Sequence, residues 1–219
     1  MEHSKLVDLG KGLGAASASW LAERTRSGFA ESLLSEALLA IPLFEFLSRD
    51  PRWRISGEWC DWKLEGLNKG DVNIDLYAES ETERLFVEFK FLKEKSLNDQ
   101  RLIKDMVKLA LPDRPEDVCL LVVAHPPSCQ TYEQSKSTLL REIDATGKPI
   151  KFRLTRRDGV APLVTSDLRT HSLTEEMGRH VDRIIRCDAR AANFVVSHVA
   201  SKRDSKFLVS VYSILRAAS

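Results

Sequence analysis

Two carboxylates and one ammonium group stand at spacings that would place them on one face of a β-hairpin. The segments 72–77 and 85–90 each alternate apolar with other residues, the pattern of a half-buried strand. Asp75 belongs to the first segment, and Glu88 and Lys90 belong to the second. Carboxylates placed this close repel each other unless a cation lies between them, and their oxygens are ligands that Mg²⁺ and Mn²⁺ prefer. A neighbouring ammonium could orient a water molecule or stabilise a developing negative charge.

The register of the hairpin decides which acid would be the ligand. The polar segment 80–83 predicts the turn. If the turn centres on the middle of that segment, Asp75 faces Glu88 across the strands, with Cβ atoms roughly 5 Å apart. A turn centred two residues earlier would pair Asp75 with Arg84 and would make Asp71 the ligand. Both registers remain open at this point.

An Asp in a strand, followed by an apolar strand that closes on Glu-x-Lys, resembles the PD-(D/E)XK superfamily of restriction-endonuclease-like nucleases. The matching residues are Asp75 and, 13 positions later, Glu88-Phe89-Lys90 within the segment LFVEFK. The proline that precedes the Asp in the family pattern is absent here. The resemblance implies that Asp75 and Glu88 bind Mg²⁺ or Mn²⁺, while Lys90 orients the attacking water or stabilises the charge on the phosphate.

Two neighbouring helices are expected to add residues to this site. The segment 28–47 has apolar residues at helical spacing. In the resembled family a first helix often presents a Glu to the metal. This implies Glu36 as a further catalytic residue, with Glu31 as an alternate ligand. A surface position on an amphipathic helix is the alternative for Glu36. The resemblance also makes Gln100 and Lys104 candidates, on a helix after the hairpin, although a solvated surface position is the simpler interpretation for both.

Apolar periodicity predicts the elements that would hold the hairpin in place. The run 118–125 is continuously apolar, which is typical of a central strand covered on both faces, and 156–172 predicts a loop. The other segments with regular periodicity are strands at 52–64, 150–155, 194–200 and 207–215, and helices at 15–26, 96–110, 131–146 and 173–192. The last of these helices carries a basic flank that could touch phosphates, although interleaved acids favour a solvated face: Arg179, Arg183, Arg186 and Arg190.

The fold class expected from this order is α/β, with a mixed central β-sheet flanked by helices. The resemblance implies a restriction-endonuclease-like core with a C-terminal α+β extension. Three regions are expected: an N-terminal helical extension over 1–27, the restriction-endonuclease-like core over 28–155, and a C-terminal helix and β-hairpin extension over 156–219 that packs on the core.

Composition narrows the expected surroundings and partners. The 33 basic and 32 acidic residues give a formal net charge of +1. Neutralisation of phosphate charge dominates the affinity of proteins for nucleic acid, so a net charge near zero disfavours tight non-specific DNA binding. Nucleic acid could still bind to a local basic surface. There is no apolar run near the ~18 residues of a transmembrane helix and no signal-peptide pattern. The four cysteines, without C-x-x-C spacing, favour free thiols in a reducing cytoplasm. The five histidines lack the spacing of zinc ligands.

The function predicted for this chain is Mg²⁺- or Mn²⁺-dependent phosphodiester hydrolysis, by a cytoplasmic nuclease. The expected partner is nucleic acid, DNA ahead of RNA, with no membrane; a second copy of the chain or another protein is left open as a partner. The alternative is a catalytically silent PD-(D/E)XK-like fold that serves as a nucleic-acid-binding, protein-binding or regulatory module.

Overall fold

The computed structural model describes residues 2–30, 34–57, 73–92, 99–125, 137–157, 160–204 and 207–217. Within these ranges one mixed sheet of nine strands runs in the order β1-β2-β3-β4-β9-β8-β5-β6-β7. The strands are β1 Arg54–Ser56, β2 Leu76–Glu79, β3 Arg84–Phe91, β4 Asp117–His125, β5 Ile150–Arg157, β6 Val160–Ser166, β7 Thr170–His171, β8 Asn193–Asp204 and β9 Phe207–Arg216. The helices are α1 His3–Arg26, α2 Glu36–Ser48, α3 Asp99–Leu109, α5 Thr138–Thr146 and α6 Glu175–Cys187, with a short 3₁₀ helix, η4, at Ala189–Ala192.

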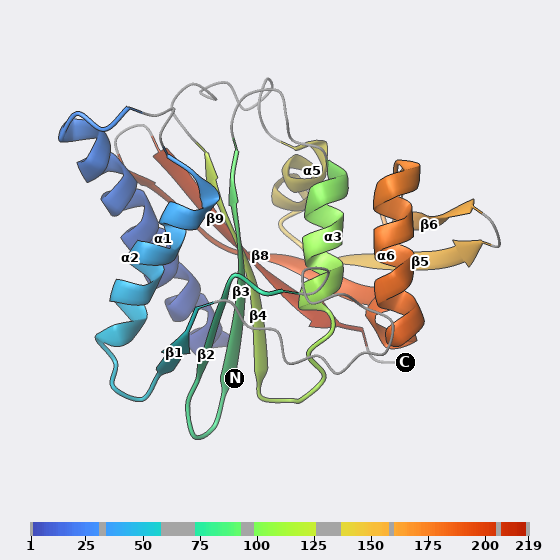
Figure 1. Cartoon of the computed structure of the whole chain (residues 1–219), viewed down its shortest axis with the longest axis horizontal. Helices are drawn as coiled ribbons and strands as arrows, with labels where there is room; N and C mark the ends of the chain where they lie inside the picture. The colour runs from blue at the N-terminus through green and yellow to red at the C-terminus, as the bar shows by residue number, and fades with distance from the viewer. Residues whose placement is uncertain are drawn as a thin grey trace.

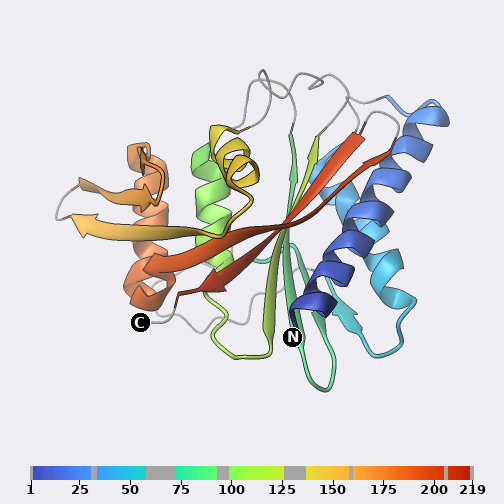
Figure 2. The same cartoon turned by 180° about the vertical axis from the view of Figure 1, so that it is seen from behind.

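Helices cover both faces of the sheet, so the fold is α/β as expected. Helices α1 and α2 lie on one side, and α3, α5 and α6 lie on the other (Figures 1 and 2). The alternation of β3 explains the two layers, because neighbouring side chains of a strand point to opposite faces. Leu85 and Val87 belong to the apolar core shared with α1 and α2. Phe86 belongs to the core shared with the other three helices.

The hairpin has the register that places Asp75 opposite Glu88. Tyr77 pairs with Phe86, and Glu79 pairs with Arg84. The alternative register, which would pair Asp75 with Arg84, is therefore wrong. The first strand is shorter than predicted, because the continuous ladder of β2 begins at Leu76 rather than at Val72, which lies outside the described residues.

Strand β4 is the central strand that its apolar run predicts. It pairs parallel to β3 on one side and antiparallel to β9 on the other. All of its residues after Asp117 are buried. Helix α3 forms the connection that parallel pairing of β3 and β4 requires.

The C-terminal hairpin is confirmed as β8 and β9, but it lies at the middle of the sheet. The sequence-based expectation was an extension packed on the core. Instead, β9 pairs with β4 and with β8, and six consecutive residues, 209–214, are buried. The hairpin therefore joins β1–β4 and β5–β7 into one continuous sheet.

Helix α1 begins twelve positions before the predicted start at residue 15, at His3. Glycines lower helix propensity. Three of them, at positions 10, 12 and 14, explain why the sequence does not predict this part of the helix. Their role is close packing: a Cβ on Gly10 would lie only 2.5 Å from Val199 Cγ1 in β8. The small residues allow α1 to approach the sheet.

Two other predicted segments need correction. The helix expected over 28–47 begins only at Glu36, and residues 31–33 lie outside the described residues. The loop expected over 156–172 contains β6 and β7. Pro162 argues against a strand, but β7 pairs with β6 only at residues 164 and 165. The proline thus lies on an open stretch of β6, where its missing N–H costs no ladder bond.

The remaining helices agree with prediction where the structure describes them. Helix α3 lies within the expected 96–110, and α5 covers the second half of the expected 131–146. Gly147 ends α5 in a left-handed conformation with φ of 58°. No helix among the described residues is long and apolar enough to cross a membrane.

Candidate active site

Five charged side chains meet beside the end of β3, and we refer to them as the carboxylate–lysine cluster. Strand β3 supplies Glu88 and Lys90, and the bend before β2 supplies Asp75. Helix α3 supplies Asp105 and Lys108, which lie on one face of the helix because they are three residues apart. Packing of α3 on the sheet thus brings its charged pair against the charged face of β3.

Asp75 is positioned by a hydrogen bond to the neighbouring strand. Its Oδ2 accepts from the backbone N–H of Phe89 at 2.8 Å. The last pair of the β2–β3 ladder is Leu76 with Val87, and one further pair in the same register places Asp75 opposite Glu88. The continuous pairing of β2 starts only at Leu76. The Asp75 carboxylate therefore accepts the hydrogen bond of the Phe89 N–H that a backbone carbonyl of a paired strand would otherwise accept.

Glu88 is buried in an ion pair with Lys108. Only 1% of Glu88 is exposed, and its Oε1 accepts a hydrogen bond from Lys108 Nζ. Lys108 Nζ also donates to the carbonyl oxygen of Asn73 at 2.8 Å and lies 3.4 Å from Asp105 Oδ1. A buried charge is costly unless it is paired and hydrogen-bonded, so each of these two side chains makes burial of the other tolerable.

Lys90 connects the cluster to α2. Its Nζ lies 3.1 Å from Asp105 Oδ2 and 3.1 Å from Glu36 Oε2. Glu36 stands in the first turn of α2, and its side chain is 47% exposed, whereas that of Lys90 is 14% exposed. Glu36 therefore reaches the site from the solvent side, through the ammonium of Lys90.

The electrostatics of the cluster keep the lysines charged. Burial would lower the pKa of Lys90, but the carboxylates of Asp105 and Glu36 outweigh it and raise that pKa above its ordinary value. Burial also opposes the charge of Lys108, whose pKa the carboxylates of Asp105 and Glu88 nevertheless raise. Burial, followed by the charge of Asp105, raises the pKa of Glu88 well above its usual range. A charged Lys90 can donate hydrogen bonds and stabilise negative charge, but it cannot accept a proton.

The donor set fits a hard divalent cation of the Mg²⁺ type. Mg²⁺ is usually bound by one or two carboxylates, with water and substrate phosphate completing its shell. Asp75 and Glu88 can supply those two carboxylates. Across the ranges that the structure describes, three or more His, Cys, Asp or Glu side chains do not come together in an arrangement that could hold a metal. A cation held by Asp75 and Glu88 would therefore depend on water or substrate for its remaining ligands.

The structure brings four of the predicted residues to one place and adds two that the sequence missed. Asp75, Glu88, Lys90 and Glu36 lie in or against the cluster, while the alternates Asp71 and Glu31 lie outside the described residues. The two additions are Asp105 and Lys108.

The signal for the two additional residues was present in the sequence of α3. Asp105 and Lys108 interrupt an otherwise apolar helix face, and a charged pair on a buried face needs a partner. The two candidates that the resemblance suggested on this helix, Gln100 and Lys104, make contacts outside the cluster. Gln100 accepts a hydrogen bond from the backbone N–H of Thr174, and Lys104 lines a separate cleft.

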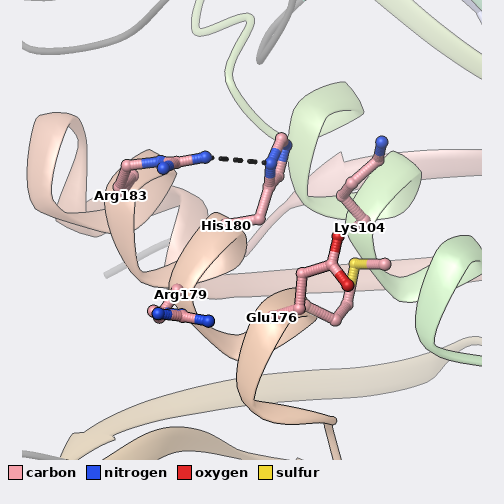
Figure 3. A pocket seen from close by; sticks show the side chains of 6 residues that line it. Lys104, Glu176, Arg179, His180 and Arg183 are labelled. Atoms are coloured by element: carbon pink, nitrogen blue, oxygen red, sulfur yellow. Dashed lines mark hydrogen bonds between the residues drawn. The ribbon is translucent and has the colours of Figure 1, made fainter.

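That cleft lies between α3 and α6 and is rich in basic groups (Figure 3). Its volume is about 360 Å³. Arg183 donates to His180 Nδ1 at 3.3 Å on one side, and Lys104 reaches in from α3 (Figure 3). The side chains that line it, which we call the basic cleft, are Lys104, Glu176, Met177, Arg179, His180 and Arg183.

The basic flank predicted on α6 divides into two parts. Arg179 and Arg183 line the basic cleft. Arg186 instead pairs with Asp182 at 2.6 Å, and Arg190, which follows α6, pairs with Asp188 at 3.0 Å. Arg179 and Arg183 are thus the part of the flank that reaches the cleft, and Arg179 also lies 3.9 Å from Glu175.

Comparison of the chain with protein-family models, with curated proteins and with solved structures finds no match. The assignment of a function therefore depends on the geometry of the carboxylate–lysine cluster and on the surfaces beside it.

Proposed function

We propose that the chain is a Mg²⁺- or Mn²⁺-dependent phosphodiesterase of the PD-(D/E)XK type that acts on nucleic acid. The observation that carries this proposal is the convergence of Asp75, Glu88 and Lys90 at the end of β3, in the register that places Asp75 opposite Glu88. Buried carboxylates and ammonium groups at one place are expensive, and functional sites are where such arrangements concentrate.

The proposed roles follow from the contacts of each side chain. Asp75 and Glu88 hold the cation. The chemistry that the bound cation supplies is polarisation of the scissile phosphate and a lowered pKa of its water. Lys90, kept charged by its neighbours, donates hydrogen bonds to the attacking water or to a phosphate oxygen. Glu36 holds the Lys90 ammonium from the solvent side.

The arrangement of elements supports the same family. Helix α2 comes before the antiparallel strands β1, β2 and β3, and α3 then connects β3 to the parallel strand β4. This is the mixed sheet flanked by helices that the resemblance implies. The cluster lies between β3 and α3, so these elements position every member of it except Asp75.

Nucleic acid is the substrate that the surroundings favour. Lys104, which lines the basic cleft, directly precedes Asp105 of the cluster in α3. A substrate phosphate group in that cleft would meet Lys104, Arg179 and Arg183. Basic surfaces of this kind supply the sequence-independent part of nucleic-acid affinity.

The proposal is tested by nuclease assays on single- and double-stranded DNA and on RNA, with Mg²⁺, with Mn²⁺ and with a chelator. Cleavage should require the cation and should fall by at least about 100-fold in Glu88→Gln and in Lys90→Met. Two exposed substitutions, Glu81→Gln and Lys148→Met, serve as matched controls and should keep wild-type activity. Circular dichroism checks that each variant is folded. Equal cleavage by wild type and by both cluster variants would mean a contaminating nuclease and would refute the assignment.

A second candidate function is a catalytically silent binding or regulatory module on the same fold. It is favoured by one observation: Lys108 already neutralises Glu88 without a metal. Under this alternative, nucleic acid binds without cleavage under any cation, and Glu88→Gln leaves the affinity unchanged. The cleavage assays, run beside a measurement of nucleic-acid affinity for wild type and Glu88→Gln, separate the two functions.

A further inference from the structure

The Lys108 ammonium lies among buried oxygens of the carboxylate–lysine cluster. It contacts three of them: the Asn73 carbonyl, Glu88 Oε1 and Asp105 Oδ1. An ammonium has three donors, so these contacts can satisfy the whole group. Only 7% of Lys108 is exposed, so water contributes little to holding its charge.

The charges of the cluster explain why such a group is needed. Three carboxylates, Asp75, Glu88 and Asp105, are opposed by two ammonium groups, Lys90 and Lys108. Lys90 lies against Asp105 and Glu36. The ammonium that touches Glu88 is that of Lys108, and without it the Glu88 carboxylate would be buried beside two like charges.

We infer that Lys108 is an internal counter-ion that holds the cation position of the cluster in the metal-free protein and leaves it when a divalent cation binds. The inference rests on the proposed function, because it takes Asp75 and Glu88 as the ligands of that cation. The flexible four-carbon side chain of a lysine makes such a movement possible without a change in the backbone.

Displacement follows from Coulomb's law at short range. A divalent cation bound to Glu88 would lie beside an ammonium that is hydrogen-bonded to the same carboxylate. Two positive charges at such a distance repel strongly in a partly dry site, so both cannot remain there. Wild type must therefore break the contacts of Lys108 with Glu88 and Asn73 in order to bind the cation. The affinity of wild type for the cation is therefore lowered by the free energy that breaking these contacts costs.

Calorimetric titration with Mn²⁺ tests the inference on the intact protein. Lys108→Met keeps the length of the side chain and removes the charge, so it should bind Mn²⁺ at least about tenfold more tightly than wild type. Lys148→Met, at an exposed position outside the cluster and the basic cleft, is the matched control and should bind as wild type does. Equal or weaker binding by Lys108→Met would overturn the inference and leave the metal site intact. Absence of Mn²⁺ binding in all three proteins would overturn the proposed metal site as well.

A second measurement on wild type covers the case in which Lys108→Met does not fold. In protein labelled with ¹⁵N at the lysine side chains, a hydrogen-bonded and buried ammonium exchanges slowly enough with water to give a resolved signal. Lys90→Met identifies which signal belongs to Lys108. Saturating Mg²⁺ should abolish that signal, because the displaced ammonium meets water. A signal that persists unshifted when Mg²⁺ is bound would overturn the inference.

Discussion

At the scale of single residues, Asp75 has two separable functions. Its carboxylate accepts the hydrogen bond of the Phe89 backbone N–H, which is a structural contact. Its negative charge also acts on Glu88 and on Lys108, which is the property a metal ligand needs. Substitutions that remove the charge and keep the hydrogen bond can therefore separate the structural function of Asp75 from its proposed function as a metal ligand.

Asp75→Asn should keep the hydrogen bond and remove the charge. Its free energy of unfolding without metal should lie within about 1 kcal/mol of wild type. Asp75→Ala leaves the Phe89 N–H without this acceptor and should lose about 1–3 kcal/mol. Millimolar Mn²⁺ should raise the melting temperature of wild type, since a ligand that binds the folded state stabilises it, and should have no effect on either variant. Urea unfolding and thermal melts measure these quantities. If Asp75→Asn still responds to Mn²⁺ as wild type does, Asp75 is not a ligand.

The predictability of the site also differs from residue to residue. A shared face for Asp75, Glu88 and Lys90 could be predicted because a strand has a period of two. The register could not, because two turn positions fit the sequence and only the pairing of β2 with β3 decides between them. Asp105 and Lys108 could not be assigned to the site, because their contacts depend on how α3 packs against β3, and sequence spacing within one helix does not contain that information. Glu36 was expected either as a catalytic residue or at a surface position, and its side chain is 47% exposed in the first turn of α2 while it contacts Lys90.

At the scale of elements, one arginine joins the ends of α3, α6 and β9. Arg216 in β9 donates to the backbone oxygens of Ala110 and Leu111, which follow α3. It also binds Asp188 Oδ2 at 2.9 Å, and Asp188 Oδ1 accepts from the backbone N–H of Arg190 at the start of η4. Arg216 thus joins the end of α3, which carries part of the cluster, to Asp188 at the end of α6.

The charge of Asp188 makes this junction sensitive to acid. Burial opposes ionisation, but hydrogen bonds from Arg190 and the charge of Arg216 hold the pKa of Asp188 below its ordinary value of 3.8. A carboxyl whose folded-state pKa is lowered adds stability above its unfolded pKa and loses it as the pH falls through the folded pKa. Asp188→Asn should therefore unfold about 1–2 kcal/mol more easily at pH 7, and this difference should shrink as the pH falls below 3.8.

Urea unfolding of wild type and Asp188→Asn between pH 7 and pH 3 measures that difference directly. Asp8→Asn, on the exposed side of α1, is the control and should stay within about 0.5 kcal/mol of wild type throughout. A difference that does not change with pH would mean that Asp188 acts by hydrogen-bond geometry alone.

The elements themselves could be predicted where periodicity is strong, and not where pairing with a distant strand decides. The apolar run of β4 and the alternation of β3 identified both strands. The sequence predicts a loop where β6 and β7 lie, because Pro162 and polar neighbours weaken their local pattern. No local signal indicates that β9 lies beside β4, because that pairing joins segments about 90 residues apart.

At the scale of the whole molecule, near-neutral charge makes local surfaces decisive. A formal net charge of +1 gives no general attraction for a polyanion. Binding of nucleic acid would therefore depend on where the basic groups gather. The basic cleft is such a place, and it shares α3 with the carboxylate–lysine cluster.

The salt dependence of binding tests whether the basic cleft contacts phosphates. Each phosphate contact adds about 0.7–0.9 to the slope of log affinity against log salt concentration, because it releases counter-ions. The double variant Arg179→Ala/Arg183→Ala should therefore bind DNA more weakly, with a slope smaller by about 1.5–2. The control removes two exposed arginines at the ends of α1 and α2, as Arg26→Ala/Arg49→Ala, and should keep the wild-type slope. Fluorescence anisotropy with a labelled oligonucleotide, in chelator to prevent cleavage, measures all three proteins. An unchanged slope in the cleft variant would place the phosphate contacts elsewhere, and a reduced slope in the control would locate them on the opposite face.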